Sequence, residues 1–376
     1  MVLPERYEIV GEPLDGGMGT VFHCKDKVLE RSVALKIIHD TTEPRRMRDE
    51  LAALLKMRSK HVVQVYDILE VARNELAIVQ EFIDGRDLFD DRTAPHSTEE
   101  FYKQLWQIAV GLSDIHALGV IHRDIKPNNM KMDAEGIIKI FDFGLARDEG
   151  HSASTLGFVG TRGFAAPELY DNEVSFTAAV DTYAFGVTAL YLATRSLPDS
   201  LKNNHLKPYG AIHIDDKYSP GFVQRSSKTY IKCDGKNYFS DVPFNMHHEV
   251  KDILESCINC PPTCRPKISA VRDILAKHLL FNRHRALVVY KGQPSYLDAN
   301  NRSVSLTLNS MGHVEIQYDG LDFRAANVLG DVYVNNMQFN SGDILPGSCV
   351  VALGTPAQGN LRKYITFDLA HPEIVL

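Results

Sequence analysis

The spacing of hydrophobic and polar positions changes twice along the chain and divides the sequence into three stretches. Up to about residue 90, apolar and polar side chains alternate over short runs, a pattern typical of β-strands. One run of helical spacing at 45–57 interrupts them, so we expect a small, mostly antiparallel sheet with one helix. The expected strands cover residues 7–11, 21–24, 33–38, 63–70 and 76–82.

Helical spacing dominates the second stretch, which follows Asp84-Gly85 and runs to about residue 282. Its first helix is expected at 98–118, where Thr98 and the two glutamates after it form a start signal. The polar segment 198–243 has no clear period and is expected to be a long excursion with a short hairpin near 230–239. Further helices are expected at 176–194, 250–257 and 268–280, and a strand is expected at 137–140.

Alternation returns in the third stretch, where turns rich in Gly, Asn and Asp separate the runs. This pattern predicts a separate β-sandwich of about 90 residues. The expected fold class is α+β, with one domain at 1–282, divided near 83–84 into a β-rich and a helical part, and an all-β domain at 286–376. The strands of the sandwich are expected at 286–290, 304–308, 313–318, 332–335, 350–353 and 364–368.

The composition is that of a globular chain with more than one domain. Its 376 residues exceed the length at which a single hydrophobic core stops growing. Apolar residues make up 44% and charged residues 24%, which supplies enough apolar material for ordinary cores. The net charge of −7 gives no reason to expect nucleic acid as a partner.

We expect a cytoplasmic chain without a membrane span. The first ten residues carry charged side chains where an export signal needs an unbroken apolar core. The longest apolar run, near 183–193, is about half of the roughly 20 residues that cross a bilayer.

Three of the six cysteines, Cys257, Cys260 and Cys264, lie close together in the sequence. A zinc or iron–sulfur site would need a fourth ligand at matching spacing. Buried or free thiols are therefore the favoured interpretation over a metal site.

The most polar turn of the chain is HRDIKPNN at 122–129, directly after an apolar stretch. Its Asn129 offers a neutral amide oxygen and an amide nitrogen. The loop LDGGMGTV at 14–21 lies between two expected strands, and its glycines let backbone amides close over phosphates. Lys36 in VALK and Asp142 in DFG add a cation and a carboxylate.

With APE at 166–168, these motifs stand in the order found in eukaryotic-type (Hanks-type) Ser/Thr protein kinases. The chain resembles this family, and its bacterial members in particular, over about residues 7–280. The resemblance implies a bilobal fold with a small β-rich N-lobe and a helical C-lobe. It also implies ATP- and Mg²⁺-dependent transfer of the γ-phosphoryl group to Ser/Thr hydroxyls of a protein substrate.

The resemblance assigns this chemistry to a few residues. Asp124 is expected to accept the proton of the substrate hydroxyl, and Lys126 to face the transferring phosphoryl group. Lys36 is expected to contact the α- and β-phosphates and to pair with Glu50. The expected Mg²⁺ ligands are Asn129 and Asp142.

Contacts to the base and the phosphates are implied in the same way. Gln80 stands at the back of the site, and the backbone of Glu81 and Ile83 is expected to face adenine. Lys131 departs from the family, which has an apolar side chain beneath the ring, and Leu14 replaces the first glycine of the phosphate loop. The further expected nucleotide contacts are Gly16, Gly17, Gly19, Val21 and Ala34.

Other positions resemble structural and regulatory residues of the family. Glu168 is expected to pair with Arg265, Asp181 to brace the backbone of the HRD turn, and His122 to pack. Arg123 is expected to meet a phosphate on the segment before Glu168, which favours autophosphorylation. The candidate phosphosites are Ser152, Ser154 and Thr155.

The third stretch contains SMGHVEI at 310–316 and GDVYVN at 330–335, which resemble elements of forkhead-associated domains. Such domains are β-sandwiches whose loops read phosphothreonine, so a phosphothreonine-containing partner is implied. The arginine that grips phosphate in that family is Gln293 here, and an amide lacks the charged fork. Arg302 or Arg324 could substitute for it.

Three functional hypotheses follow. The leading one is an active Ser/Thr protein kinase, and the alternative is a catalytically weak kinase-fold scaffold whose C-terminal sandwich binds phosphorylated partners. A kinase acting on small molecules is disfavoured, because Gly160-Thr161 and APE resemble a peptide-docking segment.

Overall fold

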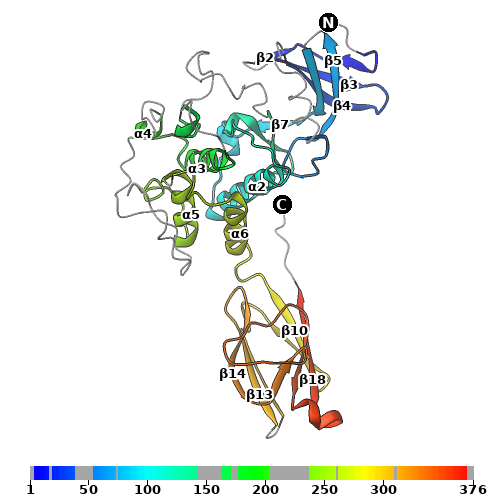
Figure 1. The fold of residues 1–376 in the computed structure, drawn as a ribbon, viewed down its shortest axis with the longest axis vertical. Helices are drawn as coiled ribbons and strands as arrows, with labels where there is room; N and C mark the ends of the chain where they lie inside the picture. The colour runs from blue at the N-terminus through cyan, green and yellow to red at the C-terminus, as the bar shows by residue number, and fades with distance from the viewer. Residues whose placement is uncertain are drawn as a thin grey trace. The chain divides into compact units, whose positions relative to one another are not determined.

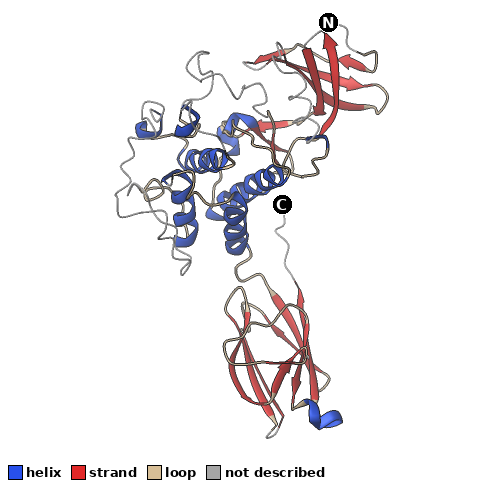
Figure 2. Ribbon diagram, in the orientation of Figure 1, coloured by secondary structure: helices blue, strands red, loops and turns tan. Residues whose placement is uncertain are grey.

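The computed structural model divides the chain into two compact units, one as far as Leu275 and one from Ala276 to Val375 (Figure 1). Each unit is described by itself. Helices and strands mix in the first unit, whereas the described part of the second, from residue 280 on, consists of strands, turns and one short helical turn (Figure 2). The structure describes residues 4–16, 19–38, 54–72, 75–142, 163–170, 177–202, 237–259, 261–308 and 311–370.

The N-terminal part of the first unit is a six-stranded antiparallel sheet in the order β1-β3-β4-β6-β5, with β2 paired to β3. Alternation along β4 buries Val33, Leu35 and Ile37 in an apolar cluster on one face, because successive side chains of a strand point to opposite faces. Lys36 therefore belongs to the other face. The strands are β1 (Tyr7–Ile9), β2 (Leu14–Gly16), β3 (Gly19–Asp26), β4 (Arg31–Ile38), β5 (Val65–Ala72) and β6 (Glu75–Glu81).

The tight turn between β3 and β4 is held by Asp26, whose side chain is buried. Its two oxygens accept hydrogen bonds from the Arg6 guanidinium at 2.8 and 2.7 Å, and Oδ1 also accepts the backbone N–H groups of Val28 and Leu29. The Arg6 contact lowers the pKa of Asp26 to about 2. This carboxylate ties the chain start to the turn.

The helical part of the first unit follows the predicted pattern. Helix α2 begins where the Ser97 hydroxyl accepts the N–H of Glu100 at 3.1 Å. Helices α3 and α5 pack closely, since a Cβ on Gly186 would lie 2.7 Å from Cβ of Cys257. The helices are α2 (Thr98–Ala117), α3 (Ala179–Thr194), α4 (Asp199–Lys202), α5 (His248–Asn259) and α6 (Ile268–Leu279).

A small sheet of β7 (Gly85–Asp87), β8 (Met130–Asp133) and β9 (Ile138–Ile140) accompanies these helices. Short 3₁₀ turns lie at η1 (Asp91–Thr93), η2 (Pro127–Asn129) and η3 (Pro167–Tyr170). Within the described ranges, none of the helices has the length and hydropathy needed to span a bilayer.

Two sequence predictions need correction. The helix predicted at 176–194 begins at Ala179, after a turn in which the Thr177 carbonyl accepts the Val180 N–H at 3.1 Å, and it ends at Thr194 as predicted. The hairpin predicted near 230–239 is not strand in its described part, where 237–239 lead into a turn. The helix predicted at 45–57 falls outside the described residues except for its last turn.

The second unit is a β-sandwich of two antiparallel sheets, in the orders β11-β10-β18-β17-β15-β16 and β12-β13-β14. Its core is apolar, with Phe323 stacked on Tyr318 and edge-on to Phe367. The six predicted strands are confirmed. The strands are β10 (Arg285–Tyr290), β11 (Gln293–Leu297), β12 (Ser303–Leu308), β13 (Gly312–Tyr318), β14 (Phe323–Gly330), β15 (Val332–Val334), β16 (Met337–Gln338), β17 (Cys349–Leu353) and β18 (Lys363–Ala370), with the helical turn η6 (Pro356–Leu361).

Candidate active site

The HRD turn holds its polar side chains in mutual contact. The Lys126 ammonium donates to Oδ2 of Asp124 at 2.8 Å. The Asn129 amide nitrogen donates to the same oxygen at 2.8 Å and to the Asp124 carbonyl at 2.7 Å. Asp124 and Asn129 are both buried. Because buried polar groups are costly unless they are paired, these bonds fix the orientation of the Asp124 carboxylate.

The backbone of this turn is held from α3 by Asp181, which is fully buried. Its carboxylate accepts the N–H groups of His122 and Arg123, each at 2.8 Å. His116 on α2 contacts the same carboxylate through Nε2, also at 2.8 Å. Arg123 adopts φ +66, a left-handed conformation that L-residues rarely adopt without support. Asp181 supplies this support, as the sequence predicts, whereas His116 was not predicted.

His122 has a packing role. Its Nε2 donates to the carbonyl of Phe141 at 3.0 Å, and its Nδ1 accepts the backbone N–H of Asp124 at 3.3 Å. Burial lowers the pKa of His122, which favours the neutral ring that these two bonds require. The ring therefore connects the HRD turn to the residue before Asp142.

Asn129 and Asp142 are brought together through backbone contacts. The N–H of Phe141 donates to the carbonyl of Asn129 at 3.0 Å, and Asp142 follows with φ +64. Lys36 of β4 forms an ion pair with Oδ1 of Asp142. Residues from three distant parts of the sequence thus meet at one place.

The donor set here fits Mg²⁺. The amide nitrogen of Asn129 is used by Asp124, which leaves the amide oxygen as its available ligand atom. A carboxylate and an amide oxygen are hard ligands of the kind that Mg²⁺ prefers. Asp142 and Asn129 are therefore the residues that would hold the ion.

The end of β6 is joined by an ion pair to β9, the strand that precedes Asp142. Gln80 and Glu81 pair across the sheet with Ala34 and Val33, respectively. The Glu81 carboxylate forms an ion pair with Lys139 of β9 at 2.9 Å. The role of Lys139 was not predicted. Its place between the buried Ile138 and Ile140 could have indicated that its side chain points to the opposite face of the strand.

Glu168 and Arg265 form the predicted pair. The guanidinium donates through both terminal nitrogens to the two carboxylate oxygens, with Nη2 at 3.0 Å from Oε2, and Nη1 also donates to the Ala179 carbonyl at 3.0 Å. Both side chains are almost fully buried. The pair ties the APE segment to the start of α3.

Comparison with known proteins bears directly on this constellation. The model for the protein kinase domain matches residues 5–278, more than half of the chain. The chain belongs to the protein kinase family. Its HRD, DFG and APE motifs are the family's own elements, and all three fall inside the matched range.

The kinase domain is similar to several curated kinases. It is 32% identical over 222 residues to the probable serine/threonine-protein kinase pknA2 of Bifidobacterium longum, covering 56% of this chain and 29% of that protein. It is 38% identical over 196 residues to the serine/threonine-protein kinase drp72 of Corynebacterium efficiens, covering 49% and 38%. The rice cyclin-dependent kinase F-3 is 28% identical over 275 residues, covering 70% and 63%.

These findings support the predicted enzyme class, a protein serine/threonine kinase. The chain spans about a third of the length of the two bacterial relatives.

Several predicted residues of the kinase domain fall outside the described part. Leu14, Gly16 and Gly19 are described by backbone pairing only, in which Leu14 lies opposite Val21 and Gly16 opposite Gly19. The residues outside the described ranges are Gly17, Glu50, Ser152, Ser154 and Thr155.

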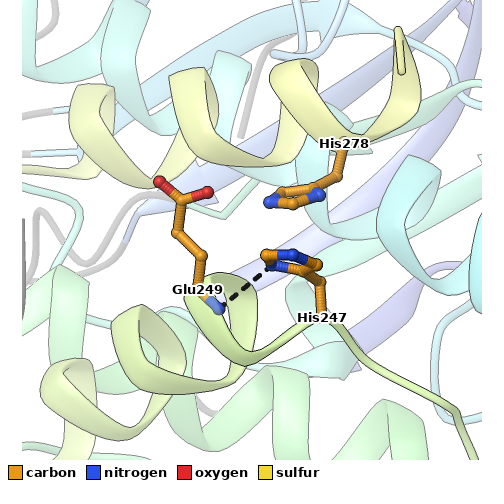
Figure 3. A group of neighbouring side chains, drawn as sticks. All are labelled: His247, Glu249 and His278. Carbon is orange, nitrogen blue, oxygen red and sulfur yellow. Dashed lines mark hydrogen bonds between the residues drawn. The ribbon is translucent and has the colours of Figure 1, made fainter. Parts of the chain in front are cut away.

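A further group of polar side chains, His247, Glu249 and His278, has its ligand atoms within 4.8 Å of one another (Figure 3). Nδ1 of His247 already accepts the backbone N–H of Glu249 at 3.3 Å, and His247 is exposed. We assign no metal to this group.

The cysteine cluster gives no metal site among the described residues either. Cys257 is buried and its thiol donates to the Ile253 carbonyl at 3.2 Å, whereas Cys264 is exposed. Both are free thiols. Cys260 lies outside the described residues.

Proposed function

We propose that this chain is an ATP- and Mg²⁺-dependent Ser/Thr protein kinase that transfers the γ-phosphoryl group to protein hydroxyls. The observation that carries the proposal is the contact network of Asp124, Lys126 and Asn129, next to the Lys36–Asp142 ion pair. Each group has the chemistry that phosphoryl transfer needs, and transfer depends mainly on positioning and charge stabilisation.

In this mechanism Asp124 accepts the proton of the substrate hydroxyl as its oxygen attacks the γ-phosphorus. The bond from that phosphorus to the bridging oxygen breaks, and ADP leaves. Lys126, whose ammonium lies 2.8 Å from the Asp124 carboxylate, stabilises charge on the moving phosphoryl group. Lys36 holds the α- and β-phosphates. Mg²⁺ bound by Asn129 and Asp142 would neutralise phosphate charge.

The adenine site is proposed at the end of β6. Backbone groups of Glu81 and Ile83 face the base, Gln80 lies behind it, and Val21 and Ala34 cover one side. The register supports this assignment, because Ala34 lies directly opposite Gln80 and Val21 lies opposite Lys36. Gly16, Gly17 and Gly19 complete the phosphate loop, and Glu50 pairs with Lys36.

We propose a bilobal kinase fold for residues 1–282, a cytoplasmic location and autophosphorylation before the APE segment. Arg123 is the cation that would receive a phosphate on Ser152, Ser154 or Thr155. Because Arg123 directly precedes Asp124, a phosphate bound by Arg123 would act on the turn that holds the proposed catalytic base.

The test is transfer of labelled phosphate from ATP to a generic protein substrate and to the chain itself. Asp124→Asn is expected to lower kcat by roughly 10²- to 10⁴-fold, because it removes the proton acceptor. Asp114→Asn, on the half-exposed surface of α2, is the matched control and should transfer normally. Equal transfer by Asp124→Asn and wild type would refute the mechanism.

A second candidate role is recruitment of a phosphorylated partner by the sandwich, with the kinase domain acting as a weak or inactive scaffold. Asn335, at φ +50, accepts the Val350 N–H through its side chain at 3.2 Å, and this fixes the loop of the VYVN element. His313 bonds the Thr307 hydroxyl at 2.7 Å. The Asn335 contact supports an ordered loop of the kind that reads peptides, whereas the His313 contact joins the neighbouring strands β12 and β13.

The two arginines that could bind phosphate already have other partners, so we expect the affinity for a phosphopeptide to be limited. Arg324 is paired with Asp319 at 2.9 Å and Asp322 at 2.8 Å, and Arg302 donates to Asn282 at 2.8 Å. Binding of phosphothreonine and unphosphorylated peptides to the full chain carrying Asp124→Asn tests this role. Equal affinity for the two peptides would exclude it.

A further inference from the structure

The end of β6 and strand β9 are joined by a part-buried ion pair. The Lys139 ammonium lies 2.9 Å from Oε1 and 3.0 Å from Oε2 of Glu81. The two side chains are 17% and 25% exposed, which shields the pair from solvent more than a surface salt bridge. Oε2 also accepts the backbone N–H of Gln64 at 3.3 Å.

The ion pair closes a ring of contacts. Ile140 of β9 donates its N–H to the His61 carbonyl at 2.9 Å and accepts the Val63 N–H at 2.8 Å. The carbonyl of Gln64 accepts the N–H of Glu81 at 2.8 Å. The segment 61–64 is therefore bonded to β9 on one side and to β6 on the other.

The negative charge of Glu81 also offsets repulsion between Lys139 and a second lysine. Lys131 lies directly opposite Lys139 across β8 and β9, and Asp87 lies opposite Lys131 across β7 and β8. Like charges in opposed positions destabilise a strand pair. Glu81 and Asp87 at the two ends of this row offset the charges of the two lysines.

Strand β9 leads to Asp142, one of the two proposed metal ligands. Asp142 follows Ile140 by two residues, while Glu81 begins the segment whose backbone is proposed to face adenine. The distance between these two points decides whether one nucleotide can contact both. If Glu81 and Asp142 were held at the wrong distance, nucleotide binding would weaken although every catalytic group is still present.

We infer that Lys139 is a positioning residue for nucleotide, which acts through its ion pair with Glu81 to hold the end of β6 at a fixed distance from β9, the strand that leads to Asp142. The inference rests on the proposed function for the identity of the ligand. It assigns to the Glu81 side chain a role separate from that of its backbone.

The test measures the Kd of Mg–ADP by calorimetry and the KM and kcat for ATP, on the full chain. Lys139→Met and Glu81→Gln are each expected to raise Kd and KM about threefold to tenfold, with kcat changed less than about twofold. The double variant should be no worse than either single one, because both remove the same interaction. Lys267→Met removes an exposed lysine and is the matched control.

The charge-reversed variant Glu81→Lys with Lys139→Glu separates positioning from packing. It should restore Kd toward wild type, since it rebuilds the ion pair and gives Lys131 an opposite charge across the strands. Single variants with unchanged Kd, or a reversed pair as weak as the singles with an unchanged melting temperature, would overturn the inference. A shifted Kd in a chain that transfers no phosphate would instead overturn the proposed function alone.

Discussion

The two units of the chain differ most in what they bury. Among the described residues, the first unit buries charged side chains such as Lys36, Asp124, Glu168 and Asp181, whereas the only polar side chain buried in the sandwich is Arg362. Arg362 donates to the Gly354 carbonyl at 2.9 Å and lies over the rings of Tyr333 and Tyr364.

Burying charge is expensive unless each group is paired, so it is expected where chemistry or specific bracing requires it. The core of the sandwich is mainly apolar, and Arg362 is held by a carbonyl and two aromatic rings rather than by a carboxylate. The buried charges of Asp124 and Asp181 at the HRD turn, with Lys36, therefore support the proposed active site.

The largest expected effect comes from breaking a buried ion pair of the first unit. Arg265→Met leaves Glu168 charged and without its partner, and should lower the free energy of unfolding of that unit by roughly 3–5 kcal/mol. Arg324→Met breaks an exposed pair of the sandwich and should cost less than about 1 kcal/mol. Urea titrations that follow each unit would measure both, and similar losses would contradict the comparison.

The sequence predicts those parts of the first unit that depend on residues near one another in the chain. Alternation at Val33, Leu35 and Ile37 places β4 correctly, and the spacing from Asp124 to Asn129 identifies the turn that the structure closes by hydrogen bonds. The helix at α2 is also predicted nearly to its ends. These features depend on neighbours in the chain, which a sequence displays directly.

The missed features depend on distant partners. His116 gains its role from Asp181, 65 residues away, and Lys139 from Glu81, 58 residues away. Strand β14 escaped prediction because only Phe323 and Ala325 of its side chains are buried, which leaves no alternating run to recognise. No local pattern contains these relations.

A smaller effect is expected from pH. Burial lowers the pKa of His61 and of His122 in the folded chain, so the unfolded chain binds a proton more readily near pH 6. Their contribution to stability is present above the unfolded pKa of about 6.5 and is lost as pH falls below it.

Melting temperatures at pH 7.5 and 5.5 would measure this loss. No histidine is buried in the sandwich as described, so its transition should move less than that of the first unit. His61→Gln should reduce the pH dependence, while His96→Gln removes an exposed ring and serves as the control. An unchanged dependence in His61→Gln would show that this histidine is protonated equally in both states.

The finest test uses two buried thiols as reporters of the two units. Burial raises the pKa of Cys257 to about 12 and that of Cys349 to about 11, so both resist alkylation while folded, whereas the exposed Cys264 should react at once.

As the urea concentration increases, each buried thiol should react when its own unit unfolds. Arg265→Met should move the reaction of Cys257 to lower urea and leave that of Cys349 in place. Mass spectrometry of the labelled peptides distinguishes the sites, and a joint shift of both cysteines would mean that the two units unfold as one.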